Sequence, residues 1–522
     1  MAEAIRVEER PVGATDGRAP TLSLNALVFC AGAGSLATEI GAARLLAPYY
    51  GSSTIVWANV IGLVLASLSV GYWLGGRLAD RRPEPRVLGA VVLVAAVLIA
   101  IVPFAAGPFL DVSVNGLDQV SAGAALGSFF AVLALFAPPV TLLGMVAPFA
   151  IRLAIDDVRD AGSVAGRLYA LSTIGSLLGT FASALVAIPT IGTQRTLLCA
   201  AVLVALPGAA LLGRRWLVVA AAIGALLAVP AGSVRAEPGL IFQQESRYQF
   251  IHVTEQHGVR RLYLNEGLAV HSIWHRDTVL TGGEWDTYLA VPPLLGRPLR
   301  RVAILGNAGG TTARALGVFY PDARVDGVEL DPAVTTVGRR FFGLNDNPRL
   351  RVITADARPF LRQTNERYDL IVVDAYRPPY VPFYLATHEF FRLARSRLSP
   401  GGALVLNVGT VPGDHRLADG VSGTLATEFP LVLTWQPLLF NQFLIGLDRA
   451  EPKEVLIRRL GHGPLQLRPL QRLLAHDMKT AAPSADPWTD DRAPVEWLTD
   501  RMILEFAARG GLFEEYPLPT AP

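Results

Sequence analysis

Long apolar runs fill the first half of this 522-residue chain and constrain its fold more than any other feature. Six runs are long enough to cross a bilayer core, which takes roughly 20 apolar residues, and a seventh is weaker. The runs lie near 25–47, 54–76, 87–107, 122–150, 165–188, 195–212 and, for the weak one, 216–231. Only 17% of the residues are charged, against roughly 25% in soluble domains. A wholly soluble or disordered protein is therefore excluded. The sequence predicts a flexible tail over 1–20 and a multi-pass α-helical membrane domain with about seven helices over 21–233.

Arginine-rich loops mark one side of this predicted membrane domain. They follow the second, fourth and sixth runs, whereas the loop after the third run contains Asp111 and Asp118 and no basic residue. Positively charged loops stay in the cytoplasm, so we place the N-terminus there. Seven full crossings would put the C-terminal half outside. We therefore expect the weak seventh segment not to cross, which gives a multi-pass protein of the cell membrane, surrounded by lipid, with a cytoplasmic soluble domain.

Three features inside the apolar runs bear on packing and chemistry. The pairs Gly71/Gly75 and Gly175/Gly179 have the spacing that lets helices approach closely, so we expect them at helix contacts. Glu39 is the only acid inside a run, and both a structural partner and a functional carboxylate stay open for it. The two cysteines also lie in apolar runs, which excludes a disulfide framework and a cysteine metal cluster.

The second half of the chain has the pattern of soluble domains. Segments 248–253 and 260–264 alternate apolar and polar residues around Gly258, which predicts a small β-hairpin module over 238–292. Strand patterns then alternate with helical ones over 293–450, which predicts an α/β doubly wound, mainly parallel sheet. The strands are expected at 302–305, 324–329, 351–354, 368–373 and 403–407, with helices such as 332–342 and 385–398. A partly helical extension follows over 451–522, with a helix near 494–508.

Glycines and carboxylates follow successive strands of this predicted sheet. The run Gly306-Asn-Ala-Gly-Gly310 follows the first strand, Glu329 ends the second, Asp356-Ala357 follow the third, and Asp374 follows the fourth. Open parallel sheets bind ligands beyond the carboxyl ends of their strands. The glycine run is not a GxGxxG motif, which disfavours a dinucleotide. Because an acid about 20 residues after the glycine run can accept both ribose hydroxyls, we predict a nucleoside-binding site.

These motifs resemble those of the spermidine synthases, the polyamine aminopropyltransferases. The resemblance rests on Ser246-Arg-Tyr-Gln249, Gly306–Arg314, Val328-Glu-Leu-Asp-Pro332, Asp356-Ala357 and Tyr368–Asp374, in that order, and it covers about 240–450. It implies a class I methyltransferase-like fold preceded by a β-hairpin module. The membrane half, with Gly75-Gly-Arg-Leu-Ala-Asp-Arg-Arg82 between two runs, resembles the membrane region of membrane-fused members of this family.

The resemblance implies a role for each matching residue. Glu329 would accept the ribose hydroxyls, Asp356 would accept the adenine amine, and Ala357 would contribute backbone. Gln249 would lie beside the ligand tail, and Gly306 and Gly309 would line the nucleoside. Asp374 would be the catalytic acid that orients and deprotonates the attacking amine. The implied co-substrate is decarboxylated S-adenosylmethionine, with no tightly bound cofactor and no metal.

The chain departs from the family at its amine-binding positions. An aspartate of the glycine loop is Gly309 here, a glutamine of the first module is Val270, and the acid three residues after Asp374 is Arg377. A Tyr-His-Glu run corresponds approximately to 285–287, which reads Trp-Asp-Thr. Arg377 would repel an ammonium group and suit a carboxylate. Arg377 and Tyr376 are therefore candidate substrate-binding residues, and a position of Arg377 away from the pocket stays open.

Three other segments have weaker or ambiguous signals. The loop 374–384 is dense in proline and tyrosine and is interpreted as a lid over a flat ligand. His271 and His275 have i,i+4 spacing, but no acidic partner flanks them, so we interpret them as loop or surface histidines. We assign no chemistry to Thr489-Asp-Asp-Arg-Ala-Pro494.

The leading hypothesis is a membrane-anchored transferase that moves an aminopropyl group to putrescine or a related amine. Two alternatives stay open: methyl transfer from intact S-adenosylmethionine, and a catalytically silent domain that senses a nucleoside or polyamine and regulates the membrane helices. A formal charge of +2 gives no basis for nucleic-acid binding. The sequence leaves the oligomeric state open, including a homo-oligomer.

Overall fold

The computed structural model describes residues 21–50, 54–117, 123–155, 157–230, 237–265, 269–376 and 381–509. They form two compact units, one built mainly from the N-terminal helices and one that contains all of the chain after 232. The predicted tail over 1–20 lies outside the described residues, and so does Arg377.

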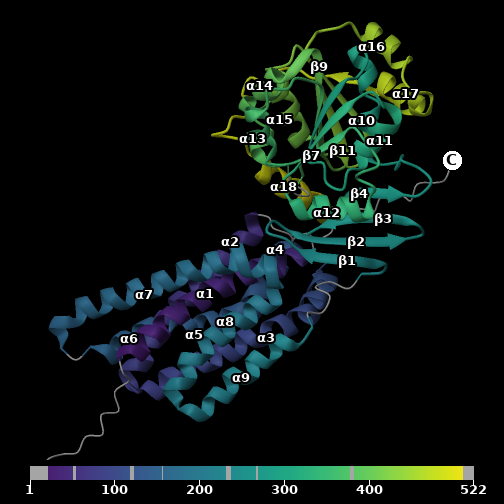
Figure 1. Cartoon of the computed structure of the whole chain (residues 1–522). Coiled ribbons are helices and arrows are strands. Elements are labelled where there is room, and N and C mark those ends of the chain that lie inside the picture. The colour runs from purple at the N-terminus through teal and green to yellow at the C-terminus, as the bar shows by residue number, and fades with distance from the viewer. Residues whose placement is uncertain are drawn as a thin grey trace, which may run out of the picture. The chain divides into compact units, whose positions relative to one another are not determined.

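Long apolar helices make up the N-terminal unit and lie side by side in Figure 1. Their bounds are α1 Thr21–Tyr50, α2 Thr54–Arg81, α3 Pro85–Leu117, α4 Gly123–Ala131, α5 Ala137–Gly144, α6 Val146–Ala154, α7 Ala161–Ala182, α8 Ile188–Leu212 and α9 Leu217–Ala225. Within the described residues, five helical segments are long and apolar enough to cross a membrane: 23–50, 55–81, 85–110, 126–154 and 158–212. The last of these leaves helical geometry at Gly192, between two of the predicted runs. Helix α9, on the weak seventh run, has only nine residues.

The glycine pairs lie at close helix contacts, as predicted. A Cβ on Gly175 would come within 2.2 Å of the Phe29 carbonyl oxygen, and one on Gly179 within 2.3 Å of the Ala33 oxygen, so α7 approaches α1 backbone to backbone. A Cβ on Gly71 of α2 would likewise lie 2.2 Å from the Thr141 oxygen of α5. Small residues at these positions allow van der Waals packing that any larger side chain would prevent.

Two sheets organise the C-terminal unit. The first is antiparallel, in the order β1-β2-β3-β4, with bounds Leu240–Glu245, Phe250–Gln256, Val259–Leu264 and Val270–His275. The predicted hairpin is β2-β3, and Gly258 takes φ 76° in its turn. The second sheet has eight strands in the order β12-β10-β11-β9-β8-β5-β6-β7. Their bounds are β5 Arg301–Leu305, β6 Arg324–Glu329, β7 Leu350–Thr354, β8 Tyr368–Val373, β9 Leu398–Gly409, β10 Leu431–Leu438, β11 Asn441–Leu447 and β12 Lys479–Thr480.

The eight-stranded sheet is mixed. Strands β5 to β9 are parallel, as the sequence predicts, and β6 and β8 have the predicted bounds. Strands β11, β10 and β12 add antiparallel pairing at the β9 edge, beyond the strands that the sequence predicts. Strand β8 is buried along its whole length, as expected for a central strand covered on both faces.

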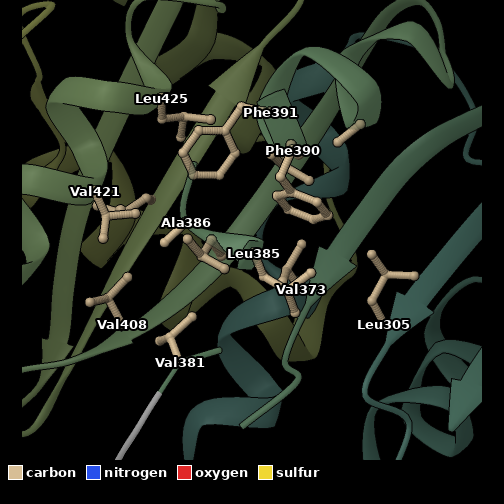
Figure 2. Packing of buried hydrophobic residues seen from close by; sticks show 14 of the residues in the cluster. Leu305, Val373, Val381, Leu385, Ala386, Phe390, Phe391, Val408, Val421 and Leu425 are labelled. Atoms are coloured by element: carbon tan, nitrogen blue, oxygen red, sulfur yellow. The ribbon is translucent and has the colours of Figure 1, made fainter. Parts of the chain in front are cut away.

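Helices cover both faces of this sheet. They are α10 Glu284–Leu289, α11 Thr311–Phe319, α12 Pro332–Phe341, α13 Ala357–Gln363, α14 His388–Ser396, α15 Arg416–Leu425, α16 Lys453–Leu460, α17 Arg468–Asp477 and α18 Val495–Ala508. Figure 2 shows the core on one face, where Phe390 of α14 lies toward Val373 of β8 and Phe391 lies toward Leu425 of α15. This packing fixes the position of the carboxyl end of β8 and therefore of the next residue, Asp374, which lies in the candidate site.

Candidate active site

The carboxyl ends of four parallel strands meet at one edge of the large sheet. The register places Leu305 of β5 beside both Val328 of β6 and Val373 of β8, and Glu329 beside Thr354 of β7. The residues that follow these strands therefore gather at the same edge, where they line a cavity of about 410 Å³. The predicted residues among its lining are Gln249, Gly306, Glu329, Asp356, Ala357, Asp374 and Tyr376.

The turn after β5 requires glycine at its first position. Gly306 has φ 90°, and a Cβ there would lie 2.3 Å from the backbone oxygen of Asp374 and 2.6 Å from Ala375. No larger residue allows this approach between the two strand ends. The turn then presents the Ala308 N–H to Glu329 Oε2 at 2.9 Å. The glycine run thus connects the ends of β5, β6 and β8.

Gly309, predicted to line the nucleoside, is not among the residues that line the cavity. Its N–H donates to Ser272 Oγ at 2.8 Å. A Cβ there would lie 2.9 Å from that oxygen and 3.2 Å from the Phe342 ring. The space for a side chain at this position is therefore filled by Ser272 and Phe342. An aspartate, as in the spermidine synthases, would require both to move.

Glu329 is held rigidly at the end of β6. It is 9% exposed, and it accepts hydrogen bonds from the Ala308 N–H and, at 3.0 Å, from the Asp331 N–H. Burial raises its pKa to about 7, although these backbone donors act in the opposite direction. A carboxylate has about four acceptor positions. Glu329 therefore has capacity for further hydrogen bonds to hydroxyl groups in the cavity.

Asp356 and Ala357 form the start of α13. Asp356 caps this helix by accepting the Arg358 N–H at 3.1 Å, and it also accepts the Tyr384 hydroxyl at 3.2 Å. The cap places its carboxylate at the end of β7 beside the cavity, and Ala357 follows with 8% exposure. The tyrosine comes from the predicted lid segment, so this carboxylate connects the sheet edge to that segment.

Asp374 is the carboxylate at the end of the central strand β8. Burial raises its pKa to about 6, while polar contacts from the Tyr288 and Asn407 side chains lower it. The Tyr376 hydroxyl donates to the Asn407 carbonyl oxygen at 2.5 Å. Two tyrosines thus enclose this carboxylate. At pH 7 to 8 it is mainly ionised and able to accept a proton.

Gln249 belongs to a small network that includes an acid without an assigned role in the sequence analysis. Asp331 is 1% exposed and accepts the Ser246 hydroxyl at 2.5 Å and the Gln249 side-chain amide at 3.5 Å. Asp331 lies two residues after Glu329 in the quoted motif, which is a signal that could have identified it. The network joins the antiparallel sheet to the edge of β6.

Two segments close the cavity from the C-terminal part of the chain. The second half of the predicted lid, Val381, Pro382, Phe383 and Tyr384, lines it together with the next residue, Leu385. Arg377 and the three residues after it lie outside the described residues, so its predicted role stays a prediction. Glu496, in the first turn of α18, also lines the cavity. No motif in the sequence pointed to Glu496, because it is far from the sheet along the chain.

The prediction of loop or surface histidines is wrong for His271. It lies with His275 in β4 and lines the cavity. A register shift in the pairing of β3 with β4 lies beside this position. Val270, at the position of the family's glutamine, is 7% exposed and packs in the core with Tyr263 and Trp285. The strand therefore presents the next residue, a histidine, to the cavity.

The cavity lining is strongly acidic. Among the described residues it contains five carboxylates, from Glu329, Asp331, Asp356, Asp374 and Glu496, and no lysine or arginine. Low-dielectric walls strengthen the field of such a cluster. The site therefore favours a cationic ligand over an anionic one.

Comparisons with known proteins show what the C-terminal half of the chain is similar to. Residues 287–432 match the spermine/spermidine synthase domain family. A Bifidobacterium longum protein named as a probable polyamine aminopropyl transferase is 34% identical over 195 residues, which are 37% of this chain and 43% of that protein. Polyamine aminopropyltransferase 1 of Streptomyces coelicolor is 26% identical over 437 residues, 74% of this chain and 76% of that one. Spermidine synthase from Thermotoga maritima, a solved structure, is 16% identical with a TM-score of 0.35, covering 49% of this chain and 82% of the other. The chain thus spans less than half the length of the Bifidobacterium relative.

Proposed function

The C-terminal part of this chain belongs to the spermidine synthase-like family, and on that premise we propose that the protein is a membrane-anchored aminopropyltransferase. It takes decarboxylated S-adenosylmethionine as donor and putrescine or a related amine as acceptor. The observation that carries the proposal is the acidic cavity with Asp374 enclosed at the end of β8. The five helical segments of membrane-spanning length support the anchoring.

The donor binds through the ends of β6 and β7. Glu329 accepts hydrogen bonds from the two ribose hydroxyls, and Asp356 accepts one from the adenine amine. The fixed positions of both carboxylates reduce the entropy lost when the donor is oriented. The sulfonium and the terminal ammonium of the donor are both cationic, which fits the five carboxylates of the lining.

Transfer is a single displacement at carbon. The acceptor nitrogen attacks the carbon next to the sulfonium, an N–C bond forms, and the C–S bond breaks with its electron pair on sulfur. A neutral thioether leaves. Asp374 orients the acceptor and takes the proton that its nitrogen loses. A pKa of about 6 leaves this carboxylate ionised above neutral pH, as the proton transfer requires.

The test is Asp374→Asn in the full-length, detergent-solubilised protein. Loss of a positioned base costs about 10²- to 10⁴-fold in turnover, while calorimetry should find donor affinity within a few-fold of the wild type. Asp322→Asn is the matched control, because the Asp322 side chain is 70% exposed and lies outside the cavity lining. Unchanged turnover in Asp374→Asn would refute the assignment of the base.

A second candidate function is methyl transfer from intact S-adenosylmethionine. The observation that favours it is Gly309, where the space for an amine-binding aspartate is filled by Ser272 and Phe342. Without this aspartate, the ammonium group of the donor has one carboxylate partner fewer than in the spermidine synthases. Turnover assays with both donors distinguish the two functions by their products, a polyamine or a methylated acceptor.

A further inference from the structure

His271 is a polar side chain of the cavity that no step of the proposed transfer uses. It comes from β4 and lines the cavity together with Gln249 and Leu264. Both of its ring nitrogens are buried, and neither has a hydrogen-bond partner of adequate geometry among the described residues. A buried polar group without a partner costs free energy, so its presence requires an explanation.

The surroundings of His271 leave its imidazole neutral. Burial lowers its pKa to about 4, the Ala269 backbone partly offsets this shift, and the nearby His252 adds to it. The Nε2 atom of His252 lies 3.2 Å from a Glu237 carboxylate oxygen. A neutral imidazole has one N–H donor and one lone-pair acceptor.

We propose that His271 binds an ammonium group of the substrate through the lone pair of its neutral imidazole. This inference rests on the proposed function, in which both donor and acceptor carry a primary ammonium group. The acidic lining selects cations, and three of its five carboxylates, Glu329, Asp331 and Asp356, already accept backbone, serine or tyrosine donors. The lone pair of His271 adds an acceptor without a partner for an ammonium group, which has three N–H donors to satisfy.

The backbone beside His271 supports a binding role. Val270 packs into the core, where a family glutamine would have been polar, and the adjacent Ser272 accepts the Gly309 N–H. Compared with the family pattern, the apolar residue of this strand is at position 270 and the hydrogen-bonding residue is at position 271. A histidine needed only for packing would be replaceable by leucine with no effect on binding.

The experiment measures binding and turnover in the full-length, detergent-solubilised protein. The probes are decarboxylated S-adenosylmethionine, 5′-methylthioadenosine, which is the same nucleoside thioether without the aminopropyl tail, and putrescine. The variants are His271→Leu, which removes both nitrogens, and His271→Asn and His271→Gln, which return an amide oxygen near either nitrogen position. His275→Leu is the matched control in the same strand, because His275 does not line the cavity.

We expect His271→Leu to lower the affinity for decarboxylated S-adenosylmethionine, or to raise the KM for putrescine, by about 10- to 100-fold. The first result assigns the contact to the donor's ammonium and the second to the acceptor's. Affinity for 5′-methylthioadenosine should change by less than about threefold, and one of the two amide variants should recover most of the loss. Because the substitution removes an unpaired buried group, the thermal midpoint should stay the same or rise.

Three outcomes would overturn the inference while leaving the proposed function intact. The first is unchanged donor affinity and acceptor KM in His271→Leu. The second is an equal loss for 5′-methylthioadenosine, which would place the contact on the nucleoside. The third is an equal effect of His275→Leu. Failure of the wild-type protein to bind either nucleoside would instead overturn the proposed function itself.

Discussion

Replacing Gly306 by alanine tests whether the turn after β5 positions the site. The substitution imposes two separate costs. Holding a residue with a Cβ at φ 90° costs about 1–2 kcal/mol. The new Cβ would also lie 2.3 Å from the Asp374 backbone oxygen, and forced backbone shifts of this kind cost about 1–3 kcal/mol. The expected total is about 2–5 kcal/mol.

Gly258→Ala separates the two costs. Gly258 has φ 76°, but a Cβ there would meet no atom within 4 Å, so only the conformational cost applies. Native-state hydrogen exchange at β5 and β3 in the full-length protein gives the local free energy of opening for each variant. We expect Gly306→Ala to lower the local free energy of opening by about 1–3 kcal/mol more than Gly258→Ala does. Equal losses would refute the conclusion that the strand ends meet at Gly306.

Three further predictions concern the site and its supports. The rate of transfer should rise with pH through an apparent pKa of about 6, because Asp374 must lose its proton to act as base; this acid limb should vanish in Asp374→Asn. Arg358→Ala should lower protection of α18 from hydrogen exchange by about 1–2 kcal/mol, since the Arg358 side chain is 10% exposed and pairs with Asp490 at 2.6 Å; unchanged protection would contradict this. Gly309→Ala should lower the free energy of unfolding, measured by chemical denaturation, by about 1–3 kcal/mol. The same substitution should cost less in a protein that also carries Ser272→Gly, and additive costs of the two substitutions would refute the contact.

The sequence was most informative where local pattern and position coincide. Buried parallel strands are largely apolar runs, so the bounds of β8 could be read directly, and those of the more polar β6 were also predicted correctly. The acids at the ends of those strands could be predicted as a group, because parallel topology alone brings the strand ends together. The glycine pairs of the helices were also readable, since their spacing has one main structural use.

Features that depend on distant parts of the chain could not be predicted. Glu496 reaches the cavity from α18, which packs against α15, and the Arg358–Asp490 pair joins segments 132 residues apart. The pairing of β11 with β9 and of β12 with β10 is long-range and leaves no local signature, whereas β10 and β11 are joined by only two residues. The lack of a flanking acid predicts a loop or surface position for His271, but the residue lies in a strand beside an irregular pairing, which no local pattern indicates.

Calorimetric titration of the full-length protein with decarboxylated and with intact S-adenosylmethionine tests the central claim most directly. The two ligands differ by one carboxylate, which the acidic lining should repel. At about 8 Å and an effective dielectric constant near 20, one like-charged pair costs about 2 kcal/mol, or roughly 30-fold in affinity. The account predicts tighter binding of the decarboxylated form. Tighter binding of the intact form would contradict aminopropyl transfer in favour of methyl transfer, and binding of neither would contradict a nucleoside site.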